Sequence, residues 1–552
     1  MRRKRQGGLL LFLMALAMTT LACGLFGAGE DEIPSDAEVV TVVANASLRP
    51  WLGSAVPTFN ENPPETAAGD PVFVVVDFVE SGQAVTELAG GAEAALWLPE
   101  ERVWVNVLAD QGNGDFQGDC ASVAESPLVI AMWRPAAEAL GWPGLPLGWL
   151  DVGSLAADPS AWSYYSGGEL GDSFRLAHTH PGLSGSGAST LLALVQSAEA
   201  KTEAVTPEDI QQPIVQASVG AFESGVTTFS PSTDVLGATM RERGVDYLTA
   251  AVMYENVAVF YGNGEIVPIY PLEGTFVADH PACINQAAPA AVQEGAQLFR
   301  DYLRDVAAQE TAVSVGLRPV NDAVAIPPGG LLDSTQGVDL AEPAVVFSSP
   351  TVEALYGVQE VWQAARKPVN LVMLLDTSGS MRGGKMDGMR TAAIQFVEQM
   401  GEEDRISLIA FETEPYLLIE NALIGEARDE VVGLIAGLEA SGDTTLFDAI
   451  GDGAGVIART ESVATTNAMV VLTDGQDTRS YRFRFDAELI TAATSFDTTI
   501  FTIAYGSDAD EQVLSELAAR GNGTYYVGDE ASIAAIYDEM SAAFGGSVGF
   551  GR

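Results

Sequence analysis

Basic residues are scarce in this chain of 552 residues. It has 27 Lys and Arg against 75 Asp and Glu, which gives a formal net charge of −48 at pH 7. Beyond residue 5, only three lysines remain, at Lys201, Lys367 and Lys385. Binding nucleic acid through a basic surface, or anionic lipid through a polybasic patch, needs clustered cations. The composition therefore argues against both, and is compatible with a well-solvated surface or with a salty or cation-rich environment.

Histidine and cysteine are also scarce, with three of each. His178 and His180 have one further histidine, His280, and no cysteine cluster beside them, which disfavours a zinc site. The chain has no Walker-type loop and no HExxH motif, and the 182–186 segment ends in Ser where a nucleophile elbow needs Gly. We predict no catalytic residues and no enzymatic activity. Hydrophobic residues make up 47% of the chain, which is enough to form buried cores. The length of the chain favours two or three folded domains.

Long apolar runs are absent after the N-terminus. Positive residues 2–5 precede an apolar run from Leu9 to about Ala22, which is too short for a comfortable membrane span and has the form of a secretory signal. The run ends in Leu21-Ala22-Cys23-Gly24, which resembles a bacterial lipoprotein signal in which Cys23 becomes lipidated. Thr20 departs from that pattern, and an ordinary cleaved signal is the alternative. Residues 24–36 read as an acidic tether.

The two remaining cysteines are Cys120 and Cys283. In an exported chain, two leftover cysteines favour a disulfide, with lone buried thiols as the alternative. The predicted location is extracytoplasmic, with the protein anchored to the cell membrane by the lipidated N-terminal Cys23 alone.

The C-terminal third alternates strand and helix patterns. An apolar strand is predicted at 369–376, with further strands at 405–411, 468–474, 499–506 and 523–528 and helices between them. This alternation predicts a doubly wound α/β domain, whose ligands bind beyond the carboxyl ends of the strands. Oxygen-bearing side chains gather in three of these loops: Asp376, Ser378 and Ser380; Thr444; and Asp474. Such hard donors suit Mg²⁺, Mn²⁺ or Ca²⁺.

This pattern resembles the von Willebrand factor type A (VWA) domain over residues 369–544. Asp376-x-Ser378-x-Ser380, followed by Thr444 and by Asp474-Gly475, matches its metal-ion-dependent adhesion site in order and position. The resemblance implies that the five residues hold a divalent metal, whose open position takes an acidic side chain from a protein partner. A VWA fold that binds no metal is the alternative.

Residues 37–340 carry a second α/β pattern, in which strands run into Ser or Gly turns that open helices. Strands are predicted at 39–44, 71–78, 96–99, 127–133 and 247–261, and a helix at 188–197. Helix N-termini of this kind suit anions. The layout, with Ser81-Gly82-Gln83 and the 181–187 turn, resembles type II extracellular solute-binding proteins. That resemblance implies two lobes closing on a small solute or anion, with Ser47, Ser81, Ser126 and Ser184 lining the cleft. Plain helix capping is the alternative for each serine.

The predicted organisation is a signal peptide (1–23), the tether (24–36), a bilobal solute-binding-like domain (37–340), a linker with a helix (341–368), a VWA domain (369–544) and a tail (545–552). This order resembles a class of bacterial surface lipoproteins and implies metal-dependent protein recognition together with small-ligand binding. The alternative function is the substrate-binding component of an ABC-type transporter with an accessory VWA domain.

Overall fold

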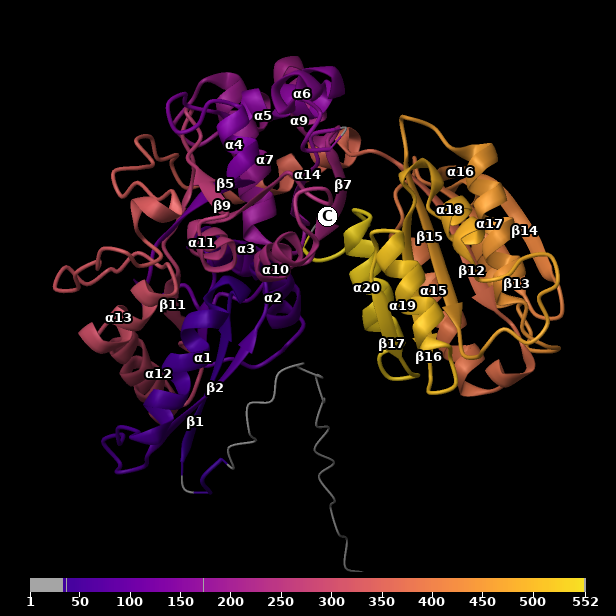
Figure 1. Ribbon diagram of the computed structural model, residues 1–552. Helices are drawn as coiled ribbons and strands as arrows, with labels where there is room; N and C mark the ends of the chain where they lie inside the picture. The colour runs from indigo at the N-terminus through magenta and orange to yellow at the C-terminus, as the bar shows by residue number, and fades with distance from the viewer. Residues whose placement is uncertain (1–32, 36, 172, 551–552) are drawn as a thin grey trace, which may run out of the picture.

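The computed structural model describes residues 33–35, 37–171 and 173–550. The predicted signal peptide, Cys23 and most of the tether lie outside the described residues. Figure 1 shows two α/β bodies, an N-terminal body built on two sheets and a C-terminal body built on one. The predicted α/β fold class is confirmed. In the part of the chain that the structure describes, no helix has the length and apolar character needed to cross a membrane.

The first lobe of the N-terminal body is a five-stranded sheet in the order β2-β1-β3-β11-β4. Its strands are β1 (Glu38–Ala44), β2 (Val72–Phe78), β3 (Leu96–Leu98), β4 (Cys120–Ser122) and β11 (Pro281–Ile284). Its helices are the 3-10 turn η1 (Ala46–Leu48), α1 (Arg49–Glu61), α2 (Ser81–Ala89), α3 (Val103–Asp110), α12 (Ala290–Leu303) and α13 (Val306–Ser314). Cys120 and Cys283 lie opposite each other on β4 and β11 and form a disulfide.

The second lobe has a six-stranded sheet in the order β10-β5-β8-β6-β7, with β9 paired to β5. Its strands are β5 (Ser126–Trp133), β6 (Leu176–Thr179), β7 (Val226–Ser230), β8 (Ala250–Tyr254), β9 (Ile266–Ile269) and β10 (Val277–Ala278). Its helices are α4 (Arg134–Ala139), α5 (Trp149–Ala157), α6 (Pro159–Ser166), α7 (Gly185–Glu199), α8 (Pro207–Ile210), α9 (Pro213–Glu223), α10 (Thr233–Arg243) and α11 (Glu255–Gly262). The chain passes between the lobes after β4, again after β10, and a third time after α13, since Val346 pairs with Thr275 of the second lobe.

One strand prediction is wrong in this lobe. Residues 247–261 do not form a single strand, because β8 ends at Tyr254 and α11 begins at Glu255. A continuous apolar run fits a buried helix as well as a buried strand, so hydrophobicity alone could not place this boundary.

The C-terminal body is a six-stranded sheet in the order β14-β13-β12-β15-β16-β17, parallel except for the edge strand β14. Its strands are β12 (Val369–Asp376), β13 (Arg405–Phe411), β14 (Pro415–Leu423), β15 (Thr466–Thr473), β16 (Thr499–Tyr505) and β17 (Tyr525–Gly528). Its helices are α15 (Gly384–Gln399), α16 (Ile424–Ala436), α17 (Leu446–Thr460), α18 (Ala487–Ala493), α19 (Glu511–Arg520) and α20 (Ile533–Ala543), with 3-10 turns η3 (Gly379–Met381) and η4 (Ser495–Asp497).

Both faces of this sheet are buried, as a doubly wound fold requires. On β12, Leu371 and Met373 belong to the core shared with α15, α16 and α20, while Val372 and Leu374 belong to the core shared with α17 and α19. Successive side chains of a strand point to opposite faces, so a strand covered on both sides reads as one apolar run. The edge strand β14, which we did not predict, is half-exposed and has no such run.

Two segments join the bodies. Helix α14 (Val352–Ala365) packs against α7, α8 and α9 of the second lobe. It ends at Arg366, whose guanidinium forms a buried ion pair with Asp404 of the C-terminal body at 2.8 Å. Beyond α20, residues 545–550 run back to the N-terminal body, and we call them the C-terminal strap.

Candidate functional site

The two carboxylates of the predicted metal site lie on neighbouring parallel strands. Asp376 is the last residue of β12, and Asp474 follows β15 directly, with Leu375 opposite Leu472 in the register. Both aspartates are fully buried. Thr473 donates a hydrogen bond to Asp376 Oδ2 at 2.5 Å, which ties the two strand ends together. These strands flank the point where the chain reverses its direction across the sheet, the usual ligand position in such folds.

The three predicted hydroxyls lie beside these carboxylates. Ser378 N–H donates to Asp376 Oδ1 at 2.7 Å, the Ser378 and Ser380 hydroxyls are 3.0 Å apart, and Ser380 Oγ donates to Asp474 Oδ1 at 2.7 Å. Thr444 lies on the adjoining loop: a Cβ added to Gly475 would be 3.7 Å from Thr444 Oγ1. The structure thus brings all five sequence-predicted residues to one end of the sheet.

Lys385, which the sequence did not single out, also belongs to this group. Its ammonium pairs with Asp474 Oδ2 at 2.6 Å from the first turn of α15. A cation therefore already neutralises the carboxylate that a metal would use. Burial raises the pKa of Asp376 to about 6, and the hydrogen bonds from Thr473 and Ser378 oppose this rise.

The donor set fits a hard divalent cation. It consists of two carboxylates and three hydroxyls, so all of its donors are oxygen atoms. The ammonium of Lys385 lies beside them and pairs with Asp474. Because hydroxyls add no formal charge, an ion held here stays electrophilic toward an outside ligand. Across the described ranges, no group of three or more His, Cys, Asp or Glu side chains is placed to hold a metal, so this hydroxyl-rich set is the candidate.

The four serines predicted to line the solute cleft all lie buried at the junction of the two lobes. Their hydroxyls already have partners inside the protein. Ser47 Oγ donates to Asn45 Oδ1 at 2.5 Å, Ser81 Oγ to Glu100 Oε2, and Ser126 Oγ to Asn256 Oδ1 at 2.9 Å, and Ser184 Oγ lies 3.1 Å from Ser186 Oγ. Solute binding by these hydroxyls stays a prediction.

Sequence reasoning missed the polar residues that hold this junction. Asn45 Nδ2 donates to Glu80 at 3.0 Å and to Glu100 at 2.6 Å. Asn256 Nδ2 of the second lobe donates to the Ser47 carbonyl of the first at 2.9 Å. The one available signal was position, because Glu80 and Glu100 lie within two residues of the ends of predicted strands and precede helices.

Burial makes this junction unfavourable for charge. It raises the pKa of Glu80 to about 7 and that of Glu100 well above its ordinary range, and Glu80 adds to the rise at Glu100. Burial also lowers the pKa of His280 to about 3. Glu80 Oε1, the Tyr254 hydroxyl and both ring nitrogens of His280 are buried and have no hydrogen-bond partner among the residues that the structure describes.

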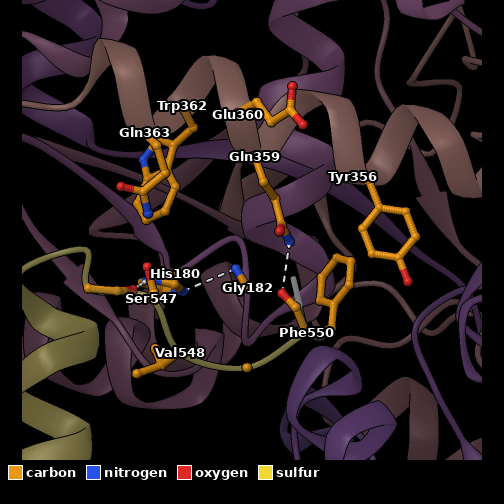
Figure 2. Close-up of a pocket in the computed structure, with 12 residues that line it drawn as sticks. His180, Gly182, Tyr356, Gln359, Glu360, Trp362, Gln363, Ser547, Val548 and Phe550 are labelled. Atoms are coloured by element: carbon orange, nitrogen blue, oxygen red, sulfur yellow. Dashed lines mark hydrogen bonds between the residues drawn. The ribbon is translucent and has the colours of Figure 1, made fainter. Parts of the chain in front are cut away.

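A cavity of about 370 Å³ lies between α14 and the C-terminal strap (Figure 2). Its walls carry His180, whose Nε2 contacts the Gly546 carbonyl at 2.9 Å, and Gln359, which donates to the Phe550 carbonyl at 3.2 Å. Burial lowers the pKa of His180 to about 3, so the imidazole is neutral. This cavity therefore lies at the seam between the two bodies.

Comparison with known proteins places both bodies. The family model of bacterial extracellular solute-binding proteins matches residues 40–318, slightly more than half of the chain, and that of the von Willebrand factor type A domain matches residues 370–539.

Individual relatives match part of the chain. The uncharacterized protein sll0103 of Synechocystis is 29% identical over 29% of this chain, and inter-alpha-trypsin inhibitor heavy chain H4 of Sus scrofa is 26% identical over 30%. The matches span 37% and 19% of those two proteins' lengths. The sulfate-binding protein SubI of Mycobacterium tuberculosis is 20% identical, with a TM-score of 0.39, over 57% of this chain and 95% of its own.

Proposed function

The chain belongs to the bacterial extracellular solute-binding proteins, and since it also carries a VWA domain, we propose that it is a membrane-anchored recognition protein. In this proposal Cys23 is lipidated and holds the protein outside the cytoplasm. The VWA domain binds a protein partner through a divalent metal, and the bilobal domain binds a small ligand. The observation that carries the proposal is the convergence of Asp376, Ser378, Ser380, Thr444 and Asp474 at one sheet edge.

These five residues would hold Mg²⁺, with Mn²⁺ or Ca²⁺ as the other hard ions of suitable chemistry. The bound ion would supply a Lewis-acidic position for a carboxylate of the partner protein. The chain itself contributes the fixed oxygen donors and the buried setting that strengthens their interaction with a cation. Lys385 pairs with Asp474 and so competes with the metal for that carboxylate.

The second candidate function is solute delivery to an ABC-type permease, with the VWA domain as an accessory. The two-lobed N-terminal body, with one sheet in each lobe, favours it. A permease gene beside the gene for this chain, together with solute uptake that depends on the chain, would support transport over recognition.

The test is calorimetric titration of residues 24–552 with MgCl₂ and MnCl₂, on the parent and on Asp376→Ala. We expect saturable binding in the parent and none in the variant. Asp443→Ala is the matched control, because Asp443 lies on the same loop as Thr444 but is exposed and pairs with Arg479 at 2.9 Å. Equal metal binding by the parent and Asp376→Ala, or none by the parent, would refute the metal-dependent function.

A further inference from the structure

Three hydrogen-bond donors converge on one buried carboxylate between the lobes. The carboxylate belongs to Glu100, which follows β3 in the first lobe and is fully buried. Asn45 Nδ2 donates to its Oε1 at 2.6 Å, Gly185 N–H donates to the same oxygen at 3.1 Å, and Ser81 Oγ donates to Oε2. Asn45 and Ser81 belong to the first lobe and Gly185 to the second, so Glu100 joins the two lobes.

Gly185 is the first residue of α7, a helix of 15 residues. The N-terminus of such a helix presents free N–H groups and favours negative charge. A Cβ on Gly185 would lie 2.7 Å from Glu100 Cδ and 2.8 Å from Trp104 Nε1, which is too close. Glycine at this position therefore lets the Glu100 carboxylate reach the end of the helix.

The lobes are closed around this carboxylate. Gly82 and Gln83 of the first lobe donate their N–H groups to the Leu183 carbonyl of the second, at 2.8 and 3.1 Å. Asn256 of the second lobe donates to Ser47 of the first at 2.9 Å. Direct hydrogen bonds thus link the two lobes, as a bound solute would.

Among the described residues, no Lys or Arg forms an ion pair with Glu100 or Glu80. Burial and the neighbouring Glu80 raise the pKa of Glu100, so this carboxyl keeps its proton to higher pH than a free one. The donors that contact it are a backbone N–H, an amide and a hydroxyl. These donors form a site for a carboxyl group, and its occupant is part of the chain.

We propose that the inter-lobe site is a carboxylate site filled by Glu100, which holds the lobes closed without a solute. An external ligand of this site is a small carboxylate that takes the place of the Glu100 side chain. This inference rests on the proposed small-ligand role of the bilobal domain and names its ligand class and its internal competitor. It does not depend on the metal site.

The test replaces Glu100 by Ala in residues 24–552 and uses sodium acetate as the probe. Radius of gyration by X-ray scattering and the thermal midpoint are measured in acetate and in NaCl of equal ionic strength. We expect Glu100→Ala to be more open than the parent and less stable, and millimolar acetate to restore both quantities. The parent should respond to acetate no more than to NaCl.

Two further variants separate the explanations. Glu101→Ala removes the next buried carboxylate, which bonds Ser189 instead of this site, and should show no acetate response. Glu100→Gln keeps the size and one acceptor oxygen of the side chain, so the lobes should stay closed. Hydrogen exchange at the Gly185 amide should be slow in the parent and in Glu100→Gln, and faster in Glu100→Ala.

The proposal is overturned if folded Glu100→Ala stays closed, or if its opening does not reverse in acetate. If Glu100→Ala does not fold, the parent decides: saturable binding of acetate by the parent would show that Glu100 does not fill the site. Saturable stabilisation of the parent by methylammonium chloride would also overturn it, because the carboxylates would then be receptors for a cation. Mg²⁺ titration of the same proteins reports the VWA site separately, so failure of either proposal is seen independently.

Discussion

Burial of the acid Glu101 lowers the stability of this protein at high pH. Its side chain is 5% exposed, accepts a hydrogen bond from Ser189 Oγ at 3.1 Å, and faces Asp279 and Tyr254. Burial raises its pKa from 4.5 to about 7, with Asp279 adding to the rise. The folded state therefore holds a proton that the unfolded state releases between pH 4.5 and 7, so this residue makes the protein less stable as pH rises through that window.

We predict that Glu101→Gln raises the free energy of unfolding above that of the parent at pH 8, and that this difference disappears at pH 4. The amide keeps an acceptor for Ser189 and carries no charge, so the variant escapes a penalty on the order of 3 kcal/mol, the equivalent of the pKa shift. The measurement is urea unfolding of parent and variant from pH 4 to 8. His180 and His280, which are present in both proteins, cancel in the difference. The exposed Glu93→Gln is the control, and a parent–variant difference that does not change with pH would contradict the prediction.

At the scale of elements, the C-terminal strap connects three parts of the molecule. Phe550 N–H donates to the Gly182 carbonyl of the second lobe at 2.9 Å. The Phe550 ring is 3% exposed and packs edge-on against Trp104 of the first lobe, with ring centroids 4.8 Å apart, and against Tyr356 of α14 at 5.8 Å. Figure 2 shows this ring beside Tyr356 and below Gln359. A segment that leaves the VWA domain therefore covers the turn that leads into α7.

We predict that Phe550→Ala destabilises the N-terminal body by about 3 kcal/mol, at the lower end of the range for deleting a buried Phe, because the adjoining cavity lets neighbours relax. Hydrogen exchange should become faster at 182–185, whereas Mg²⁺ affinity of the VWA domain should stay unchanged. The half-exposed Phe260→Ala serves as the control. Unchanged exchange at 182–185 would show that the strap does not hold this turn.

The sequence could predict those elements whose signal is local. Asp376-x-Ser378-x-Ser380 lies within five residues at the end of one apolar strand, so both the strand and its site could be predicted from the sequence. Glu100 and Gly185 are far apart in the sequence. The residues around Glu100 form no pattern that distinguishes a buried acid from a surface one. Gly546 contacts His180 across an even longer separation of 366 positions, so the sequence identified residues 545–552 only as a tail. The edge strand β14 is half-exposed and lacks the apolar run that marked its neighbours.

At the scale of the whole molecule, the net charge of −48 opposes the compact state, because like charges on one surface repel each other. The repulsion is long-ranged at low salt, where the Debye length is about 30 Å at 0.01 M, and short-ranged at about 8 Å at 0.15 M. Several aspartates that could add to it are paired locally, such as Asp452 with Arg482 at 2.7 Å. The excess of negative charge still repels itself, and the ionic strength of the surroundings determines how much this repulsion destabilises the folded state.

We therefore predict that the thermal midpoint of residues 24–552 rises when NaCl is raised from 0.01 to 0.15 M, by about 2–4 °C for each kcal/mol of repulsion that is screened. Scanning calorimetry in NaCl and in MgCl₂ of equal ionic strength separates screening from binding. Screening should act equally on the parent and on Asp474→Ala. Magnesium should add a further rise in the parent alone, which grows with the logarithm of its concentration, since a bound ion stabilises only the folded state. A midpoint that falls with NaCl would show that self-repulsion does not limit stability, and equal responses of the two proteins to MgCl₂ would assign its whole effect to screening.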